Sequence, residues 1–243
     1  MLHLHWKKAS RQITLLVIFF SFIQTFSFAQ QLNLEDHDDK PYYFGITLGM
    51  NLARFHTELN PRFLQYDTVM VAEPGNAGGF NLGLVATARL SNRFELRFNP
   101  QLMFTERHLT YVLKYPDPDD GGPNVTKNIE STIMSFPLQV KFNSDRIGNF
   151  RVYMFGGIKG DIDLASNARA KKAEQLVKIN KYDYGFEGGI GFNFYFPSFI
   201  FSPEIKISNG LSNLHSRDES LKYSNVLDRI LSRMIVFSIH LEG

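Results

Sequence analysis

The chain of 243 residues contains no cysteine. That absence excludes a disulfide framework, a metal site built on thiolates and an N-terminal lipid-modified cysteine. The chain also contains no uninterrupted run of 18 apolar residues, which argues against a membrane protein that crosses with helices. A transmembrane β-barrel stays open, because the hydropathy signal of a barrel strand is weak and lies in the alternation of its side chains.

A large charge of one sign is missing as well, since 26 Lys and Arg stand against 24 Asp and Glu. Three of the basic residues precede the apolar stretch Ile13 to Ile23, which ends before the small-x-small sequence Ser27-Phe28-Ala29. This order predicts a secretory signal peptide over residues 1–29. A retained membrane anchor is the alternative, and the shortness of the apolar stretch argues against it. The remaining chain is nearly neutral, so nucleic acid is not an expected partner.

The most regular stretch runs from Lys181 to Phe196, where Tyr, Phe and Ile alternate with Gly, Asn, Asp and Glu. A period of two places the apolar set on one face of a β-strand and the small and polar set on the other. At about 3.3 Å per residue, such a strand is long enough to cross a bilayer at a tilt.

Seven further stretches repeat this alternation, and the connections between them are alternately long and short. That rhythm is typical of outer-membrane barrels, which have short periplasmic turns and long external loops. The sequence therefore predicts an all-β fold: an eight-stranded antiparallel transmembrane β-barrel with four long external loops. The expected strands are Tyr42–Ala53, Gly79–Leu90, Arg93–Thr105, Ile129–Asn143, Asn149–Asp161, Lys181–Phe196, Phe199–Ser208 and Ser232–Glu242.

These stretches define three segments of the chain: the signal peptide (1–29), a periplasmic tail (30–41) and the outer-membrane barrel domain (42–243). The tail begins QQLNLEDHDDK and has no period, so we expect it to be flexible. Outer-membrane lipid and lipopolysaccharide would surround the barrel, and the cell outer membrane is the expected location.

A soluble ligand-binding barrel of the lipocalin type would turn the same apolar set inward. The polar set argues against this alternative, because it is rich in glycine and carries both charges, among them Glu95, Arg97, Lys141 and Glu204. Glycine suits a narrow interior in which backbones crowd, and aromatic residues gather at strand ends as in membrane girdles. Eight strands leave a lumen that side chains fill, so a structural plug is expected rather than a solute path.

No catalytic, cofactor or metal site is predicted. His215, Ser216 and Asp218 are too close in sequence to arrange readily as base, nucleophile and carboxylate. Asp117, Asp119 and Asp120 resemble a calcium loop only faintly, since Asn128 stands where a bidentate Glu is expected. A rim hydrolase or protease and a small-solute pore remain the alternative functions.

Two of the long connections are expected to be structured and to contact partners. The connection 162–180 should hold a short helix starting near Asp163 or Ser166, and 209–231 shows amphipathic helical spacing. The expected contact segments are Ser166–Lys178 and Asn209–Leu231. The candidate contact residues are Arg169, Lys171, Lys172, Lys178, Tyr223 and Leu227.

Beyond the barrel pattern, several long segments closely resemble the PorT family. They are YYFGITLGMN near Tyr42, EPGNAGGFNLG at Glu73–Gly83, YVLKYP at Tyr111–Pro116, the runs Glu130–Lys172 and Phe194–His215, and the closing SRMIVFSIHLEG. The resemblance implies a non-enzymatic outer-membrane β-barrel of the type IX secretion system. That system exports proteins bearing a C-terminal domain and supports adhesin delivery in gliding bacteria. Other secretion-system proteins are the implied partners, and the resemblance assigns no ligand residues.

Overall fold

A computed structural model describes residues 32–60, 69–115, 122–165, 179–216 and 227–243. The chain divides into Met1–Leu32 and Asn33–Gly243, and the second unit contains nearly all of the described residues. The predicted signal peptide lies outside the described residues. Within the described ranges, no helix has the length and apolar character needed to cross a membrane.

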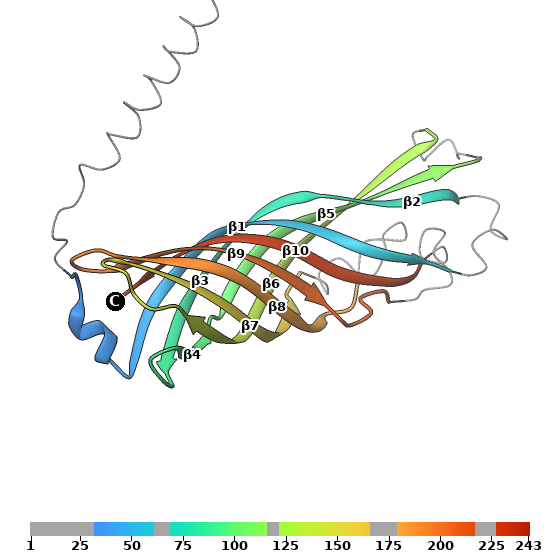
Figure 1. The fold of residues 1–243 in the computed structure, drawn as a ribbon. Coiled ribbons are helices and arrows are strands. Elements are labelled where there is room, and N and C mark those ends of the chain that lie inside the picture. Colours follow the sequence, from blue (N-terminus) through green and yellow to red (C-terminus); the bar gives the residue numbers. More distant parts are fainter. Residues whose placement is uncertain (1–31, 61–68, 116–121, 166–178, 217–226) are drawn as a thin grey trace, which may run out of the picture. The chain divides into compact units, whose positions relative to one another are not determined.

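The described residues of the second unit form ten antiparallel strands and one short 3₁₀ helix, η1 (Glu35–Asp39) (Figure 1). The strands are β1 (Tyr42–Leu59), β2 (Val69–Gly75), β3 (Ala77–Arg89), β4 (Phe94–Phe98), β5 (Gln101–Leu113), β6 (Asn124–Asn143), β7 (Phe150–Asp163), β8 (Tyr182–Tyr195), β9 (Ile200–Gly210) and β10 (Leu227–Glu242).

The ten strands form eight continuous strand segments around the barrel, called staves here, because β2 with β3 and β4 with β5 each form one stave. Only Asn76 separates β2 from β3, and only Asn99 and Pro100 separate β4 from β5. Proline has no N–H to give to the ladder, yet the Pro100 carbonyl still accepts a hydrogen bond from the Leu84 N–H at 2.9 Å. The eight predicted strands therefore correspond to these eight staves.

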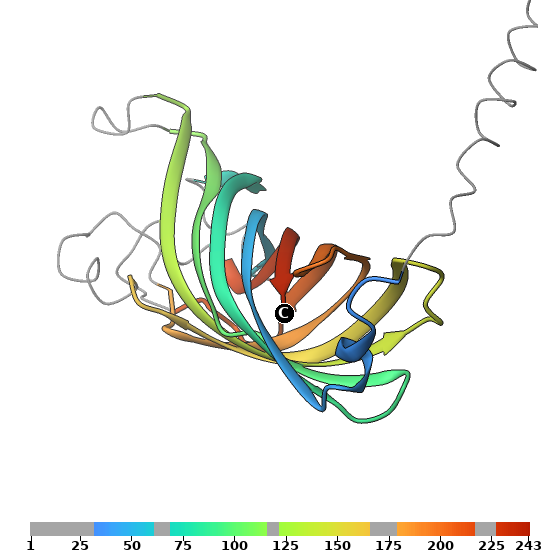
Figure 2. The ribbon, with the colours of Figure 1, turned by 90° about the vertical axis from the view of Figure 1, so that its left-hand side faces the viewer.

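The sheet closes on itself. β1 pairs with β10 on one side and β3 on the other, and the order continues through β9, β8, β7 and β6. β6 pairs with both β4 and β5, which in turn pair with β3 (Figure 2). The β1–β3 pairing closes the barrel from Tyr42–Ala88 up to Ala53–Ala77, so the strands have no free edge over this part, as strands in lipid require. Beyond Ala77, β2 pairs with β5 and forms no described pairing with β1.

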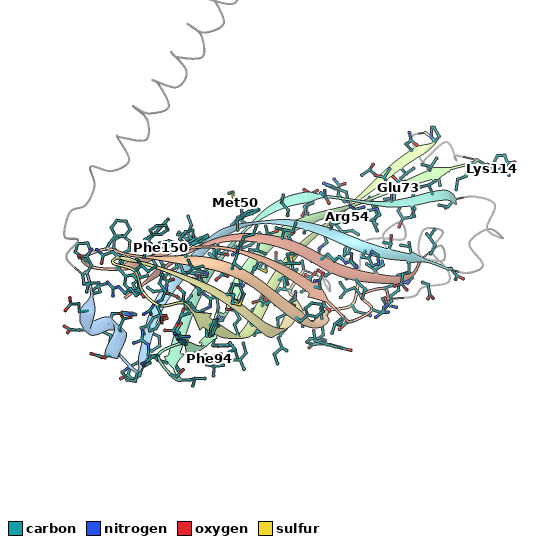
Figure 3. The ribbon with its side chains drawn as sticks, in the orientation of Figure 1. Met50, Arg54, Glu73, Phe94, Lys114 and Phe150 are labelled. Atoms are coloured by element: carbon teal, nitrogen blue, oxygen red, sulfur yellow. The ribbon has the colours of Figure 1, made fainter. Side chains whose placement is uncertain are left out.

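Large apolar side chains point out of the barrel and polar ones point in. Met50 is 68% exposed while neighbouring Asn51 is 1% exposed, and this alternation recurs on every stave. Figure 3 marks Met50, Phe94 and Phe150 on this outer surface. The inside-out prediction is confirmed, because a lipocalin-type barrel would bury the apolar set.

Short turns gather at the end of the barrel that holds Tyr42 and Glu242. These turns join β3 to β4, β6 to β7 and β8 to β9, and Figure 1 shows them beside the C-terminus. By the rule that periplasmic turns are short, this is the periplasmic end. The opposite, external end carries the four longer connections.

Several strands are longer than the sequence predicted, all at the external end. β1 continues to Leu59 and β5 to Leu113, while β6 begins at Asn124 and β10 at Leu227. The helix predicted over 209–231 is wrong in its described parts, because Asn209 and Gly210 end β9 and Leu227 begins β10. Asp163 is likewise the last residue of β7, and Ser166 lies outside the described residues.

Candidate functional site

Charged side chains cross the lumen. Arg97 on β4 reaches Glu204 on β9, with Nη2 to Oε2 at 2.5 Å, and both side chains are fully buried. β4 and β9 are separated by three strands along one side of the barrel, so this ion pair spans the interior. The Tyr153 hydroxyl on β7 donates to the same carboxylate at 3.0 Å.

Further buried ion pairs lie in the lumen. Lys141 Nζ lies 3.4 Å from Glu95, which also accepts a hydrogen bond from the Tyr43 hydroxyl at 2.9 Å. Lys206 Nζ lies 3.2 Å from Glu187. Buried carboxylates are tolerated when a cation and hydrogen-bond donors compensate their lost hydration. The lumen is therefore a paired polar core, as the structural-plug prediction requires.

Glycine makes room for this core. A Cβ placed on Gly191 would lie 2.3 Å from the Tyr153 ring, and one on Gly189 would lie 2.2 Å from the Ile205 carbonyl oxygen. Neither distance is possible for a real side chain. The glycines of the polar face thus allow both the close approach of β8 to β9 and the placement of Tyr153 in the lumen.

A hydroxyl, an imidazole and a carboxylate do come together in the lumen. The His240 ring contacts Thr47 Oγ1 through Nδ1 at 2.8 Å and lies 3.3 Å from Glu204 Oε2 through Nε2. These three side chains are buried. The trio therefore has the components of a hydrolytic site without access for a substrate.

The candidate chemistry at the external rim finds little support. His215 is buried, and its backbone forms an isolated β-bridge with Ile179. Asp218 lies outside the described residues, and so do Asp117, Asp119 and Asp120. Among described residues, no group of three or more His, Cys, Asp or Glu is arranged to hold a metal ion.

The predicted flexible tail is ordered against the periplasmic end. Asp38 of η1 accepts from Arg146 at 3.0 Å and from Arg151 at 3.2 Å. Arg89 Nη1 donates to the carbonyls of His37, at 2.8 Å, and of Asp38. The Asn33 side chain donates to the Tyr195 carbonyl at 2.9 Å. Residues from three staves thus hold this segment, which was predicted to be free.

His37 is the buried residue of η1, with its ring 4.5 Å from that of Tyr43. Its pKa is lowered from 6.5 to about 4, first by burial and then by the positive charges of Arg89 and Lys40. Glu242 and Asp38 raise the pKa and offset part of this effect. His37 is therefore neutral at pH 7 while docked.

At the external end the two faces of the sheet exchange character. Along β1, the outward positions change from Leu52 to Arg54 and His56, while the inward position between the last two is Phe55, buried to 1%. On β5, outward Glu106 and His108 flank inward Arg107. The barrel here has a polar outside and an apolar inside, the arrangement expected in water.

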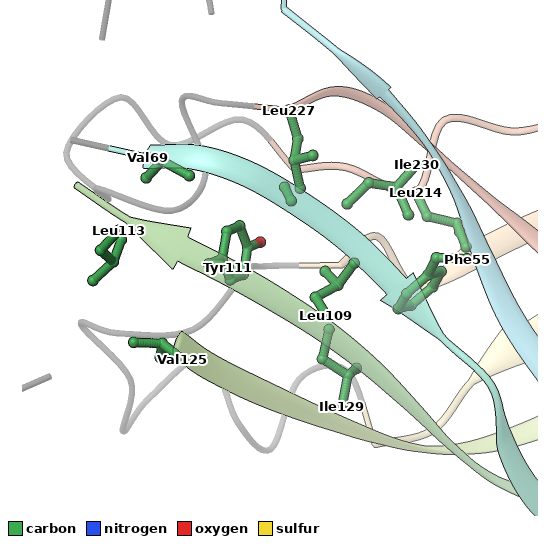
Figure 4. Packing of buried hydrophobic residues seen from close by; sticks show 11 residues of the cluster. Phe55, Val69, Leu109, Tyr111, Leu113, Val125, Ile129, Leu214, Leu227 and Ile230 are labelled. Atoms are coloured by element: carbon green, nitrogen blue, oxygen red, sulfur yellow. The ribbon is translucent and has the colours of Figure 1, made fainter. Parts of the chain in front are cut away.

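The apolar inside of this end forms one cluster, called here the external cluster (Figure 4). It draws on strands β1, β2, β5, β6 and β10 and on the connection that follows β9. Its members are Phe55, Val69, Ala72, Leu109, Tyr111, Leu113, Val125, Ile129, Leu214, Leu227 and Ile230.

Arg107 lies between the polar lumen and the external cluster. The guanidinium is buried, lies 4.8 Å from the Phe55 ring and donates to Ser232 Oγ at 3.2 Å. A small cavity beside it is also lined by Asp161, Asp163 and Asp183. Arg107 is not among the residues predicted from sequence, because residues 106–128 fall in a predicted connection between two strands.

The predicted contact residues fall into two groups. Leu227 is 1% exposed inside the external cluster, so it is not a surface contact in this structure. The others lie outside the described residues and stay predictions: Arg169, Lys171, Lys172, Lys178 and Tyr223.

A closed antiparallel barrel with an apolar outer belt and a buried ionic lumen defines an outer-membrane β-barrel protein. Residues 28–216 match the family described as outer membrane protein beta-barrel domain, and the chain belongs to that family. The family places it in the outer membrane. No curated protein matches the chain.

Solved structures of outer-membrane proteins resemble it at low identity. OprG from Pseudomonas aeruginosa is 11% identical, with 82% of this chain and 94% of that chain covered and a TM-score of 0.43. Neisserial surface protein A is 10% identical, with 82% and 96% covered and a TM-score of 0.39. Ail of Yersinia pestis, in complex with the heparin analogue sucrose octasulfate, is 11% identical, with 84% and 100% covered and a TM-score of 0.39.

Proposed function

We propose that this protein is a non-enzymatic component of the type IX secretion system, of the PorT kind, and acts through protein partners. The observation that carries the proposal is the resemblance to that family, above all over the runs Glu130–Lys172 and Phe194–His215. Its role would be in export of proteins with the type IX C-terminal domain and, in gliding bacteria, in delivery of surface adhesins.

The lumen supports action through partners rather than passage of cargo or solute. An interior crossed by the Arg97–Glu204 ion pair at 2.5 Å has no room for a polypeptide at that level. Opening it would separate a pair of fully buried charges, which costs several kcal/mol. Contact through the outer loops or the periplasmic end needs no such opening.

The basic external connection remains the proposed partner-contact surface. Arg169, Lys171, Lys172 and Lys178 lie close in sequence and would attract an acidic patch on another secretion protein. Tyr223, in the last connection, would add an aromatic contact of the kind enriched at interfaces. Pull-down with these residues changed to Gln or Ala should lose a partner that the wild-type protein retains. Equal recovery would remove these connections from the proposal.

Deletion tests the function itself. In cells lacking this protein, proteins with the type IX C-terminal domain should accumulate in the periplasm and be depleted outside, and wild-type protein should restore export. Normal export with an intact outer membrane would overturn the proposal and leave the fold standing. Steady conductance in planar bilayers would favour the small-solute pore, and hydrolytic activity lost in His215→Ala would favour the rim enzyme.

A further inference from the structure

A row of polar side chains marks the upper limit of the apolar belt on β1, β10 and β9. Arg54 on β1 pairs in register with Arg233 on β10, and Arg233 pairs with Asn209 on β9. Asn76 is exposed and directly precedes Ala77, whose pairing with Ala53 is the last one between β3 and β1, just before Arg54. We call these four residues the boundary row.

The boundary row stands directly above the lipid-facing belt. On each of these three strands, the residue two positions closer to the periplasm points to the same face and is apolar. These residues are Leu52, Ile235 and Ile207, which are 50%, 42% and 56% exposed. Two residues span about 6.6 Å along a strand. Arg54 and Arg233 therefore project at the depth where hydrocarbon gives way to lipid headgroups. Figure 3 shows Arg54 on β1 beyond Met50.

Two cations placed opposite each other on neighbouring strands repel. Both side chains are exposed, and neither makes a hydrogen bond or ion pair with any residue of the described ranges. In the next row outward His56 stands opposite Leu231, and the first carboxylate along β1 is Glu58, opposite Arg229. The fold thus holds two guanidinium groups together without an acidic neighbour in their row.

An anion between the two groups would remove this repulsion. Guanidinium binds phosphate through two parallel N–H donors, and it is more weakly hydrated than an ammonium, so it suits the edge of a membrane. The flanking Asn76 and Asn209 offer amide donors to the same group. Below the row, the exposed aliphatic side chains suit acyl chains and not a water-soluble phosphate.

We propose that Arg54 and Arg233, flanked by Asn76 and Asn209, bind a phosphate group of an outer-leaflet glycolipid, with its acyl chains along Leu52, Ile235 and Ile207. The lipid neutralises the arginine pair and fixes the height of this side of the barrel in the outer leaflet. This site is independent of the proposed role in secretion, because it concerns lipid and not protein partners.

Binding of lipid A to the folded, detergent-solubilised protein tests the proposal, with titrations of bisphosphorylated and dephosphorylated lipid A. The double variant R54Q/R233Q should bind the bisphosphorylated form about tenfold more weakly than wild type, a loss of about 1.4 kcal/mol. Dephosphorylated lipid A should bind both proteins alike. The matched control is Arg93→Gln, an exposed arginine at the periplasmic end that pairs with Asp145, and it should bind like wild type.

Equal affinity of R54Q/R233Q and wild type would overturn the site, and so would equal weakening in Arg93→Gln. Displacement of lipid A by millimolar inorganic phosphate would show a free-phosphate site and overturn the lipid assignment. If R54Q/R233Q does not fold, R54K/R233K decides: it keeps both charges, loses the paired donors and should bind with intermediate affinity. Affinity equal to wild type in that variant, together with indifference of wild type to dephosphorylation, would overturn the proposal.

Discussion

The same strands turn their apolar side chains to opposite faces in two regions of the barrel. In the membrane region, β1 turns Leu48 and Met50 outward and Thr47 inward; in the external region, it turns Arg54 outward and Phe55 inward. The period of two is unchanged. What differs is the solvent, which is hydrocarbon around the first region and water around the second. Alternation therefore identifies a strand, and the sense of alternation identifies the medium around it.

The two interiors also differ in what holds them together. The membrane region has a core of buried ion pairs such as Arg97–Glu204, whereas the external cluster is apolar. Apolar packing tolerates loss of one member at the cost of a cavity. A buried ion pair that loses one member leaves a charge without compensation. The first region should therefore be more sensitive to single polar deletions.

Loss of the central carboxylate should have the largest effect. Glu204→Ala leaves the buried Arg97 guanidinium without its 2.5 Å partner and should lower the free energy of unfolding by about 3–5 kcal/mol. Urea titration in lipid vesicles measures this. Asp145→Ala, which removes an exposed pair at 3.1 Å, is the matched control and should cost less than about 1 kcal/mol.

The double variant R97M/E204M sharpens this test. It removes both charges and keeps bulk in the lumen, so it should recover most of the loss seen in Glu204→Ala. Equal losses in the single and double variants would mean that volume, and not charge compensation, holds the lumen together.

Arginine substitutions on the outer face should have the next largest effect, and they should distinguish the region in hydrocarbon from the region in water. Leu48→Arg puts a charge into the middle of the belt and should cost about 2–4 kcal/mol. Thr110→Arg, on the outward face of β5 in the external region, should cost close to zero. Both are read from urea midpoints in vesicles. Similar costs at the two positions would place the bilayer boundary elsewhere and contradict the reversal of faces.

That reversal explains where sequence reasoning succeeded and where it stopped. The eight staves were predictable, because each has an apolar and a polar parity in the belt. Strand ends were set too early wherever polarity changed sides, as between Leu52 and Phe55 on β1. Where the apolar residues move from the outward to the inward positions, the alternation looks as though it ends if the whole strand is assumed to lie in one solvent.

The wrong prediction of a helix near Leu227 has a different cause, which is a β-bulge in β10. β1 and β10 slip in register between Glu58 and Leu59, which pair with Arg229 and Leu227. The extra residue of the bulge, Asp228, lets Leu227 and Ile230 both face inward although they are three apart. A spacing of three is a helical signal in sequence, and only the partner strand reveals the bulge.

Partners in the lumen and at the periplasmic end lay beyond sequence reasoning. Arg97 and Glu95 were placed on the inner face, but the partner of Arg97 is 107 residues away along the chain. The tail showed no period because distant Arg146 and Arg151, and not its own pattern, hold Asp38. Such contacts depend on barrel closure, which fixes which staves face each other.

Protonation of His37 should release the tail, a smaller effect that leaves both barrel regions folded. The docked imidazole has a pKa of about 4 against 6.5 when free, so between these values only the released tail binds a proton. Docking is therefore strongest above pH 6.5, weakens as the pH falls and loses up to about 2 kcal/mol at pH 5.

Because the chain contains no cysteine, a spin label on Asp36→Cys reports release without a competing thiol. The labelled segment should gain motion at pH 5, and His37→Gln should remove that dependence between pH 7 and pH 5. An equal response in His37→Gln would assign the release to the carboxylates of η1, and an unchanged spectrum in both proteins would mean that the arginine contacts of Asp38 hold the tail by themselves.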